Sequence, residues 1–267
     1  MQLASKPQAI ALAAIATVVI GASAYVGLSL LNNNTNNLPP DDSIKVKLLE
    51  NAGVMIEAKG LRIYIDPYEL PANYSDGPAD AVLVTHPHGD HYNTTMIDML
   101  QKTGTINVFP ANMTDAVSIY SGVGVKPGDT VQVGTITVTA YYMYTEIWID
   151  GERFASHPSE ANWTSYIIDI DGFKIFHAGD SKNITEYEDI AGQIDVALLP
   201  LGPGCQAMTD EEVVDAIDKL QPDHFIPIHS AFVSAELFVL SYGDDIASCS
   251  DCTPIVLESF TSCIFEP

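Results

Sequence analysis

Three histidines and one aspartate lie within six residues of this chain, in the segment Thr85-His86-Pro87-His88-Gly89-Asp90-His91. Side chains two apart in an extended segment point the same way, so His86 and His88 can face one metal ion. The turn that follows brings Asp90 and His91 round to face a second ion. Because the whole chain has only 7 histidines, this concentration favours metal binding over a solvated polar loop.

One motif does not supply enough ligands for two ions. We therefore expect further ligands at the ends of other strands, and His157, Asp180 and His229 fit that description. Neutral imidazoles and carboxylates on two divalent ions would lower the pKa of a bridging water, giving a hydroxide nucleophile near neutral pH. Asp90 is the residue we expect to orient this nucleophile and to move its proton.

The elements that must position these residues alternate between strands and helices. Two β-then-α halves are predicted, each with candidate ligands in loops at strand ends, as in a layered α/β sandwich with a cleft along one edge. We expect a loop through 151–161. The expected strands are 44–48, 54–58, 61–65, 80–84, 106–109, 131–133, 136–140, 165–170, 173–176, 196–199 and 224–228, and the expected helices run from about 91 to 102, 113 to 121 and 210 to 220.

Taken together, the 85–91 motif, His157, the segment His177-Ala178-Gly179-Asp180 and Pro227-Ile228-His229 resemble the successive metal motifs of the metallo-β-lactamase superfamily. The chain is most similar to the branch that includes ascorbate-6-phosphate lactonase-like and related metal-dependent hydrolases. Ile65-Asp66-Pro67, residues 173–180 and residues 197–202 with Met208 carry that likeness.

The resemblance implies a four-layer αββα sandwich and two divalent ions. Zinc ranks first because the ligands are rich in histidine, and manganese or iron also fits them. The implied ligands are His86, His88 and His157 for one ion, Asp90, His91 and His229 for the other, and Asp180 as a bridge between the two.

The implied activity is hydrolysis of a small-molecule substrate, with a lactone or ester ranked before a phosphoester or an amide. Two alternatives stay open: a mononuclear iron dioxygenase of the same fold, and a non-catalytic surface binding protein. His177, His224 and Asp66 are expected to support the site or the fold, and Trp163 and residues 141–144 either line the cleft or pack.

The formal net charge of -24 disfavours nucleic-acid and anionic-membrane partners. Residues 1–31 hold a stretch without charge from Gln8 to Leu31, predicted to be a signal peptide or a membrane anchor. A flexible Asn/Pro linker at 32–43 would join it to a catalytic domain at 44–267, placed outside the cytoplasm as a secreted or anchored protein. The sequence does not indicate an oligomeric state.

Two further patterns agree with export. Six asparagines stand in Asn-x-Ser/Thr triplets, namely Asn33, Asn73, Asn93, Asn112, Asn162 and Asn183, which predicts a glycoprotein. The even set of Cys205, Cys249, Cys252 and Cys263 predicts disulfides in such a compartment.

Overall fold

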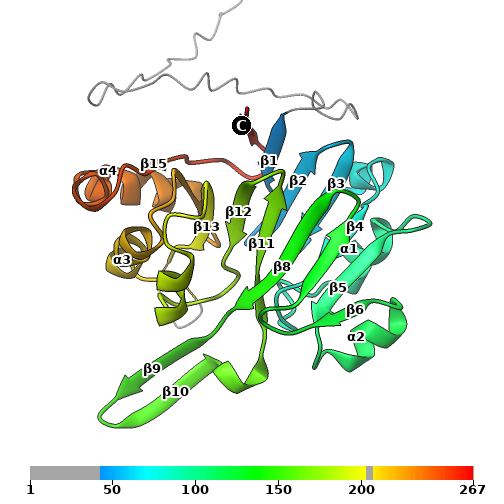
Figure 1. Ribbon diagram of the computed structural model, residues 1–267, viewed down its shortest axis with the longest axis horizontal. Coiled ribbons are helices and arrows are strands. Elements are labelled where there is room, and N and C mark those ends of the chain that lie inside the picture. Colours follow the sequence, from blue (N-terminus) through cyan, green and yellow to red (C-terminus); the bar gives the residue numbers. More distant parts are fainter. Residues whose placement is uncertain (1–42, 203–206, 267) are drawn as a thin grey trace, which may run out of the picture.

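Two seven-stranded sheets face one another in the computed structural model, which describes residues 43–202 and 207–266 (Figure 1). The first sheet has the order β16 (Ser262–Phe265), β1 (Ile44–Leu48), β2 (Val54–Ala58), β3 (Leu61–Ile65), β4 (Ala81–Leu83), β5 (Ile106–Pro110), β6 (Val123–Val125). The second has the order β15 (Thr253–Pro254), β14 (His224–Ile228), β13 (Val196–Pro200), β12 (Phe173–His177), β11 (Thr164–Ile170), β8 (Ile136–Tyr142), β7 (Thr130–Val133).

The central core lies between the two sheets. β1 shows how it forms, because its residues are alternately buried and half-buried, and Ile44, Val46 and Leu48 enter the core. Ile168 and Ile226 of the second sheet join the same cluster. One polar bond also crosses it: the buried Tyr166 hydroxyl on β11 donates to the carbonyl oxygen of Val84 at 2.8 Å, just ahead of the histidine motif.

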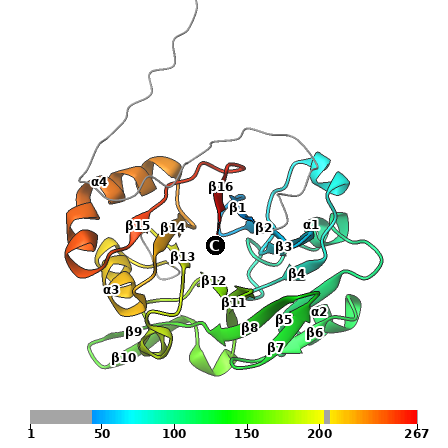
Figure 2. The same ribbon diagram turned by 45° about the horizontal axis from the view of Figure 1, so that its top comes forward.

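Helices cover both outer faces. α1 (Thr94–Met99), α2 (Thr114–Ile119) and the short 3-10 helix η1 (Ala72–Asp76) lie outside the first sheet, and α3 (Asp210–Leu220), α4 (Phe232–Cys249) and η3 (Thr185–Ile190) lie outside the second (Figure 2). α3 buries Val213, Ala216, Ile217 and Leu220, the spacing of one helix face, and a capping box starts it. The predicted mixed α/β sandwich is therefore confirmed.

Strand direction places the carboxyl ends of the parallel strands on the same edge of each sheet. β3, β4, β5 and β6 run parallel in the first sheet, and β12, β13, β14 and β15 run parallel in the second. The segments that follow β4, β12 and β14 carry the 85–91 motif, Asp180 and His229. Ligands in loops at the carboxyl ends of strands are typical of α/β folds.

Two predicted features are wrong. The loop expected at 151–161 is half of a hairpin, β9 (Thr145–Ile149) with β10 (Glu152–His157), which pairs with no other described strand and extends from the body before the short helix η2 (Ser159–Ala161) (Figure 1). The expected disulfides are absent among the described cysteines. Cys263 is packed between the sheets and Cys252 on the outer side of the second sheet, and Cys249 is also unpaired.

The predicted export segment and nearly all of the predicted linker lie outside the described residues, as does Cys205. No helix among residues 43–202 and 207–266 is long and apolar enough to span a membrane.

Candidate metal centre

Four of the predicted ligands form a first cluster. The ligand atoms of His86, His88, His157 and Asp180 all lie within 4.8 Å of one another. His86 Nε2 is 3.1 Å from His88 Nδ1 and 3.2 Å from His157 Nε2, and Asp180 Oδ2 is 3.5 Å from His157 Nε2. These nitrogens converge on one point, as ligands of a single ion do.

Asp90, His91 and His229 form a second cluster beside the first, again with ligand atoms within 4.8 Å. Asp90 Oδ2 lies 3.7 Å from His91 Nε2 and 3.6 Å from His229 Nε2. The other oxygen of Asp180, Oδ1, is 3.1 Å from His91 Nε2 and 3.6 Å from His229 Nε2. Asp180 thus presents one oxygen to each cluster, the geometry of a bridging carboxylate.

Asp180 reaches this position through a backbone that only glycine fits. Gly179 has φ +59, and a Cβ built there would lie 2.6 Å from Met143 Sδ and 3.1 Å from Thr85 Cγ2. The left-handed turn and the close approach of the histidine motif both require glycine.

Hydrogen bonds behind the ligands fix the histidine tautomers. Asp66 Oδ1 accepts from the Thr85 backbone N at 2.8 Å, and Oδ2 lies 2.6 Å from Thr85 Oγ1 and 2.8 Å from His91 Nδ1. A carboxylate only accepts, so the proton of His91 sits on Nδ1. Since the Thr85 hydroxyl donates to Asp66, it accepts from His86 Nδ1 at 2.9 Å. In both rings Nε2 is then the nitrogen that faces the ion site.

The donor set fits divalent metal ions. The buried atoms His91 Nε2, His229 Nε2 and Asp180 Oδ1 have no hydrogen-bond partner among the described residues. Buried polar groups are almost always paired, so orphaned atoms that converge on one point indicate a missing partner. Imidazole nitrogens with carboxylate oxygens suit zinc, and manganese or iron as well.

The two clusters hold protons differently in the metal-free protein. Burial lowers the pKa of His86 well below its usual value and that of His157 to about 4, so both are neutral at pH 7. Burial also lowers the pKa of His91, but Asp66 and Asp180 outweigh it and raise that pKa to about 10. His86 and His157 can therefore bind a cation directly, whereas a cation at His91 must first displace a proton.

We accordingly expect proton release on metal binding to differ between the clusters. A metal ion competes with the proton on His91, so affinity at the second cluster should rise by up to about tenfold per pH unit below pH 10, with about one proton released at pH 7. Zinc titration calorimetry in two buffers of different ionisation enthalpy measures this release. Equal release for both ions, or the same release in a His91→Gln variant, would contradict the assignment.

The remaining predicted residues lie around the clusters. Ring centroids of Trp163 lie 5.5 Å from those of His86, His88 and His157, so Trp163 lines the first cluster. His177 is outside both: its Nε2 lies 2.7 Å from the Ala52 carbonyl oxygen, and its Nδ1 accepts from Gly179 N. His224 packs against Phe265 at 5.2 Å, away from the clusters.

Sequence reasoning missed Asn51, in the turn between β1 and β2. Its side-chain amide donates to Asp90 Oδ2 at 3.1 Å, and its carbonyl oxygen accepts from His229 N at 3.0 Å. Asn51 and His229 both have positive φ, 59° and 56°. Asparagine often takes this conformation in turns, so the residue alone gives no signal; only the fold brings it to two predicted ligands.

Losing the Asn51 amide should loosen Asp90, which is 43% exposed and whose other close side-chain partners, the imidazoles of His229 and His91, lie further away at 3.6 and 3.7 Å. We expect an Asn51→Gly variant, which tolerates the positive φ, to bind zinc at the second cluster about tenfold more weakly, since a hydrogen bond to a charged group contributes about 1.5–3 kcal/mol. Asn51→Asp would place a second carboxylate beside Asp90, and repulsion between the two should also weaken zinc binding. Zinc titration with a chromophoric chelator measures both, and unchanged affinity in both would contradict the role.

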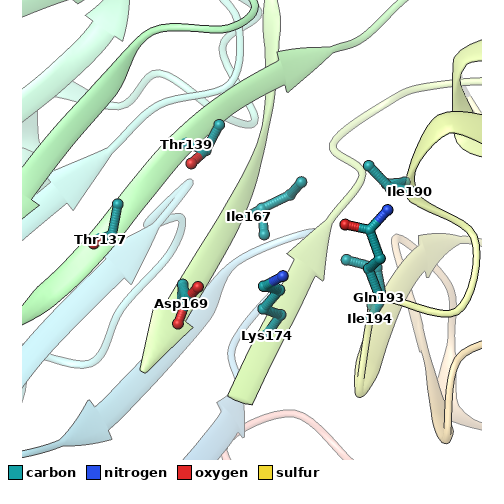
Figure 3. A pocket seen from close by; sticks show the side chains of 8 residues that line it. All are labelled: Thr137, Thr139, Ile167, Asp169, Lys174, Ile190, Gln193 and Ile194. Atoms are coloured by element: carbon teal, nitrogen blue, oxygen red, sulfur yellow. The ribbon is translucent and has the colours of Figure 1, made fainter. Parts of the chain in front are cut away.

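A separate hollow lies on the outer face of the second sheet, with Thr139, Asp169 and Lys174 on neighbouring strands and Gln193 opposite them (Figure 3). None of its lining residues belongs to either histidine cluster. The metal centre, not this hollow, is the candidate site.

Comparison with known proteins agrees with the geometry. A family model described as a beta-lactamase superfamily domain matches residues 45–229. A UPF0173 metal-dependent hydrolase of Thermococcus kodakarensis is 30% identical, over 70% of this chain and 84% of that protein.

Solved structures show the same fold. A metallo hydrolase from Ignicoccus hospitalis superposes with a TM-score of 0.68 at 22% identity, covering 84% of this chain and 99% of that one. A diiron β-hydroxylase from Streptomyces venezuelae has a TM-score of 0.62 at 14% identity, covering 86% of this chain and 55% of that one. With more than half of the sequence matched by the family model and two adjoining His/Asp clusters at the strand ends, the chain belongs to the metallo-β-lactamase superfamily.

Proposed function

We propose that this protein is a dinuclear metal-dependent hydrolase of small neutral esters or lactones. The observation that carries the proposal is the pair of clusters that share Asp180, one oxygen to each. In our assignment His86, His88 and His157 hold one ion, Asp90, His91 and His229 hold the other, and Asp180 bridges them. Two ions held there would acidify a water and polarise the oxygen of a substrate carbonyl.

The protein's own groups then complete the reaction. Asp90 is the most exposed carboxylate of the clusters, so it is placed to accept a proton from the attacking water. Water adds to the carbonyl carbon, the carbon–oxygen bond of the ester breaks, and the leaving alkoxide takes up the proton that Asp90 accepted from the water. Trp163 forms an apolar wall beside the first cluster and limits access of bulk water.

Substrate class follows from charge. The chain has 35 acidic against 11 basic residues, and a field of that sign disfavours phosphoesters and favours departure of a carboxylate product. Lactones and carboxylic esters therefore rank above phosphoesters, and the branch resemblance points the same way.

The test is a substrate screen on protein stripped of metal and reloaded with zinc, manganese or iron. We expect turnover of p-nitrophenyl acetate or γ-butyrolactone, dependent on two ions per chain, and little turnover of bis-p-nitrophenyl phosphate. His86→Ala and His91→Ala variants should each lose activity. A single iron per chain with oxygen consumption would instead establish the dioxygenase alternative.

We also propose that the domain works outside the cytoplasm as a glycoprotein. Among the described acceptor sites, the Asn73 and Asn112 side chains are exposed, which supports their use, whereas the exposed Asn162 amide already donates to the Glu160 carbonyl oxygen at 3.1 Å. The Asn93 side chain is already engaged, because its oxygen caps α1 by accepting a hydrogen bond from Met96 N. Peptide-level mass spectrometry of protein from its native source should show glycans on Asn73 and Asn112 and none on Asn93; unmodified protein in the cell lysate would overturn both proposals.

A further inference from the structure

The β9–β10 hairpin has two chemically different faces. Cross-strand pairs share a face, and the pairs Ile147 with Phe154 and Ile149 with Glu152 lie on one side of the hairpin. The pair Trp148 with Arg153 lies on the other. The first side is apolar except at its tip.

The second side is fixed by ion pairs. Arg153 lies 2.5 Å from Glu146 and 2.5 Å from Glu160, and Glu146 also accepts from Ser159 N at 2.7 Å. These contacts attach the hairpin to η2. They leave the opposite side uncovered, with Ile149 53% and Phe154 52% exposed and Ile147 half-buried.

The apolar side leads directly to the metal centre. Thr145 and His157 form the next pair on the same side, after a β-bulge between Ala155 and His157. His157 belongs to the first metal cluster, and Thr145 Oγ1 donates to the Asp180 carbonyl oxygen. Trp163, beside His157, continues the apolar surface at the cluster itself.

We propose that the apolar side of the hairpin, formed by Ile147, Ile149 and Phe154, binds the hydrocarbon chain of the substrate. This rests on the proposed function: it makes the substrate an ester or lactone of a medium or long acyl chain, with its carbonyl at the metal centre and its chain along the hairpin. Continuity with His157 argues for this occupant. The charge of the protein argues against an anionic one.

A chain-length series tests the proposal. Complete burial of a methylene is worth about 0.8 kcal/mol, or about fourfold in kcat/KM, and a half-exposed surface should deliver about twofold per methylene. With p-nitrophenyl esters of two-, six- and ten-carbon acids, kcat/KM should rise steeply with length. The ten-to-two-carbon ratio should fall at least tenfold in an Ile149→Ser/Phe154→Ser double variant.

The hairpin supplies its own control. Trp148 is 67% exposed on the opposite side, so Trp148→Ser removes a large apolar group without touching the proposed surface. It should leave the ratio unchanged. The inference would be overturned if the ten-to-two-carbon ratio fell equally in both variants. It would also be overturned if the wild type hydrolysed the short ester but its kcat/KM did not change with acyl length; in either case the proposed function stands.

Binding of the neutral fluorophore N-phenyl-1-naphthylamine gives a readout that does not depend on turnover. Wild type and Trp148→Ser should bind it at least tenfold more tightly than the double variant, with or without metal. If no ester is hydrolysed but this pattern holds, the proposed function fails and the apolar site stands. Sedimentation gives a further check. If the wild type is a dimer and the double variant a monomer, while the ten-to-two-carbon ratio of kcat/KM is the same in both, a second copy covers the surface and the inference is wrong.

Discussion

An Asp180→Ala variant is expected to lose metal from both clusters and about 10³-fold or more of the hydrolytic activity. Its two oxygens face different clusters, so one substitution removes a ligand from each and takes from His91 Nε2 its nearest carboxylate oxygen, which lies 3.1 Å away. Elemental analysis after gel filtration should find less than one-tenth of the wild-type metal.

The matched control is Asp189→Ala, an exposed carboxylate on η3 nine residues further along the chain. It should keep wild-type metal content and activity. Two tightly bound ions in Asp180→Ala would contradict the bridging role, whereas loss of one ion only would show that Asp180 belongs to a single cluster.

An Asp66→Asn variant is expected to weaken the second ion by about 10–100-fold although Asp66 touches no ion. The amide must place an N–H near either Thr85 or His91, both of which now donate to Asp66. An N–H facing His91 Nδ1 moves the imidazole proton to Nε2, where the ion should bind. The mismatched buried bond should also cost about 1–3 kcal/mol of unfolding free energy.

Asp195→Asn separates these two effects. Asp195 likewise accepts from a strand backbone, Lys174 N at 2.6 Å, but lies outside both clusters. Zinc titration and denaturant unfolding should show a stability loss in both variants and an affinity loss only in Asp66→Asn. Equal zinc affinity in the two would mean that Asp66 supports the fold alone.

Most of the candidate ligands can be picked out of the sequence because they are marked locally. His86 to His91 are concentrated in one motif, and Asp180 and His229 follow apolar runs that can only be buried strands. Such signals need no knowledge of distant contacts. All seven predicted ligand residues lie in the two clusters, including His157, which stands in the segment expected to be a loop and has no such local mark.

What the sequence did not predict depends on contacts between distant segments. Asn51 lies 39 residues from Asp90 and is brought to it by sheet pairing. β10 was expected to be a loop because its mostly polar residues lack the alternation of a buried strand. α4 was not expected either, since Val233, Leu237 and Leu240 are apolar yet exposed, which obscures any helical periodicity.

The order of the candidate ligands along the chain limits when the two ion sites can form during synthesis. In the first sheet, the 85–91 motif follows β4, which lies between β3 and β5. The second sheet contributes Asp180 and His229. His229 comes after the other six candidate ligands in the chain, so a nascent chain cannot complete the second ion site until residue 229 has been synthesised, and we expect the second ion to be acquired only after that point.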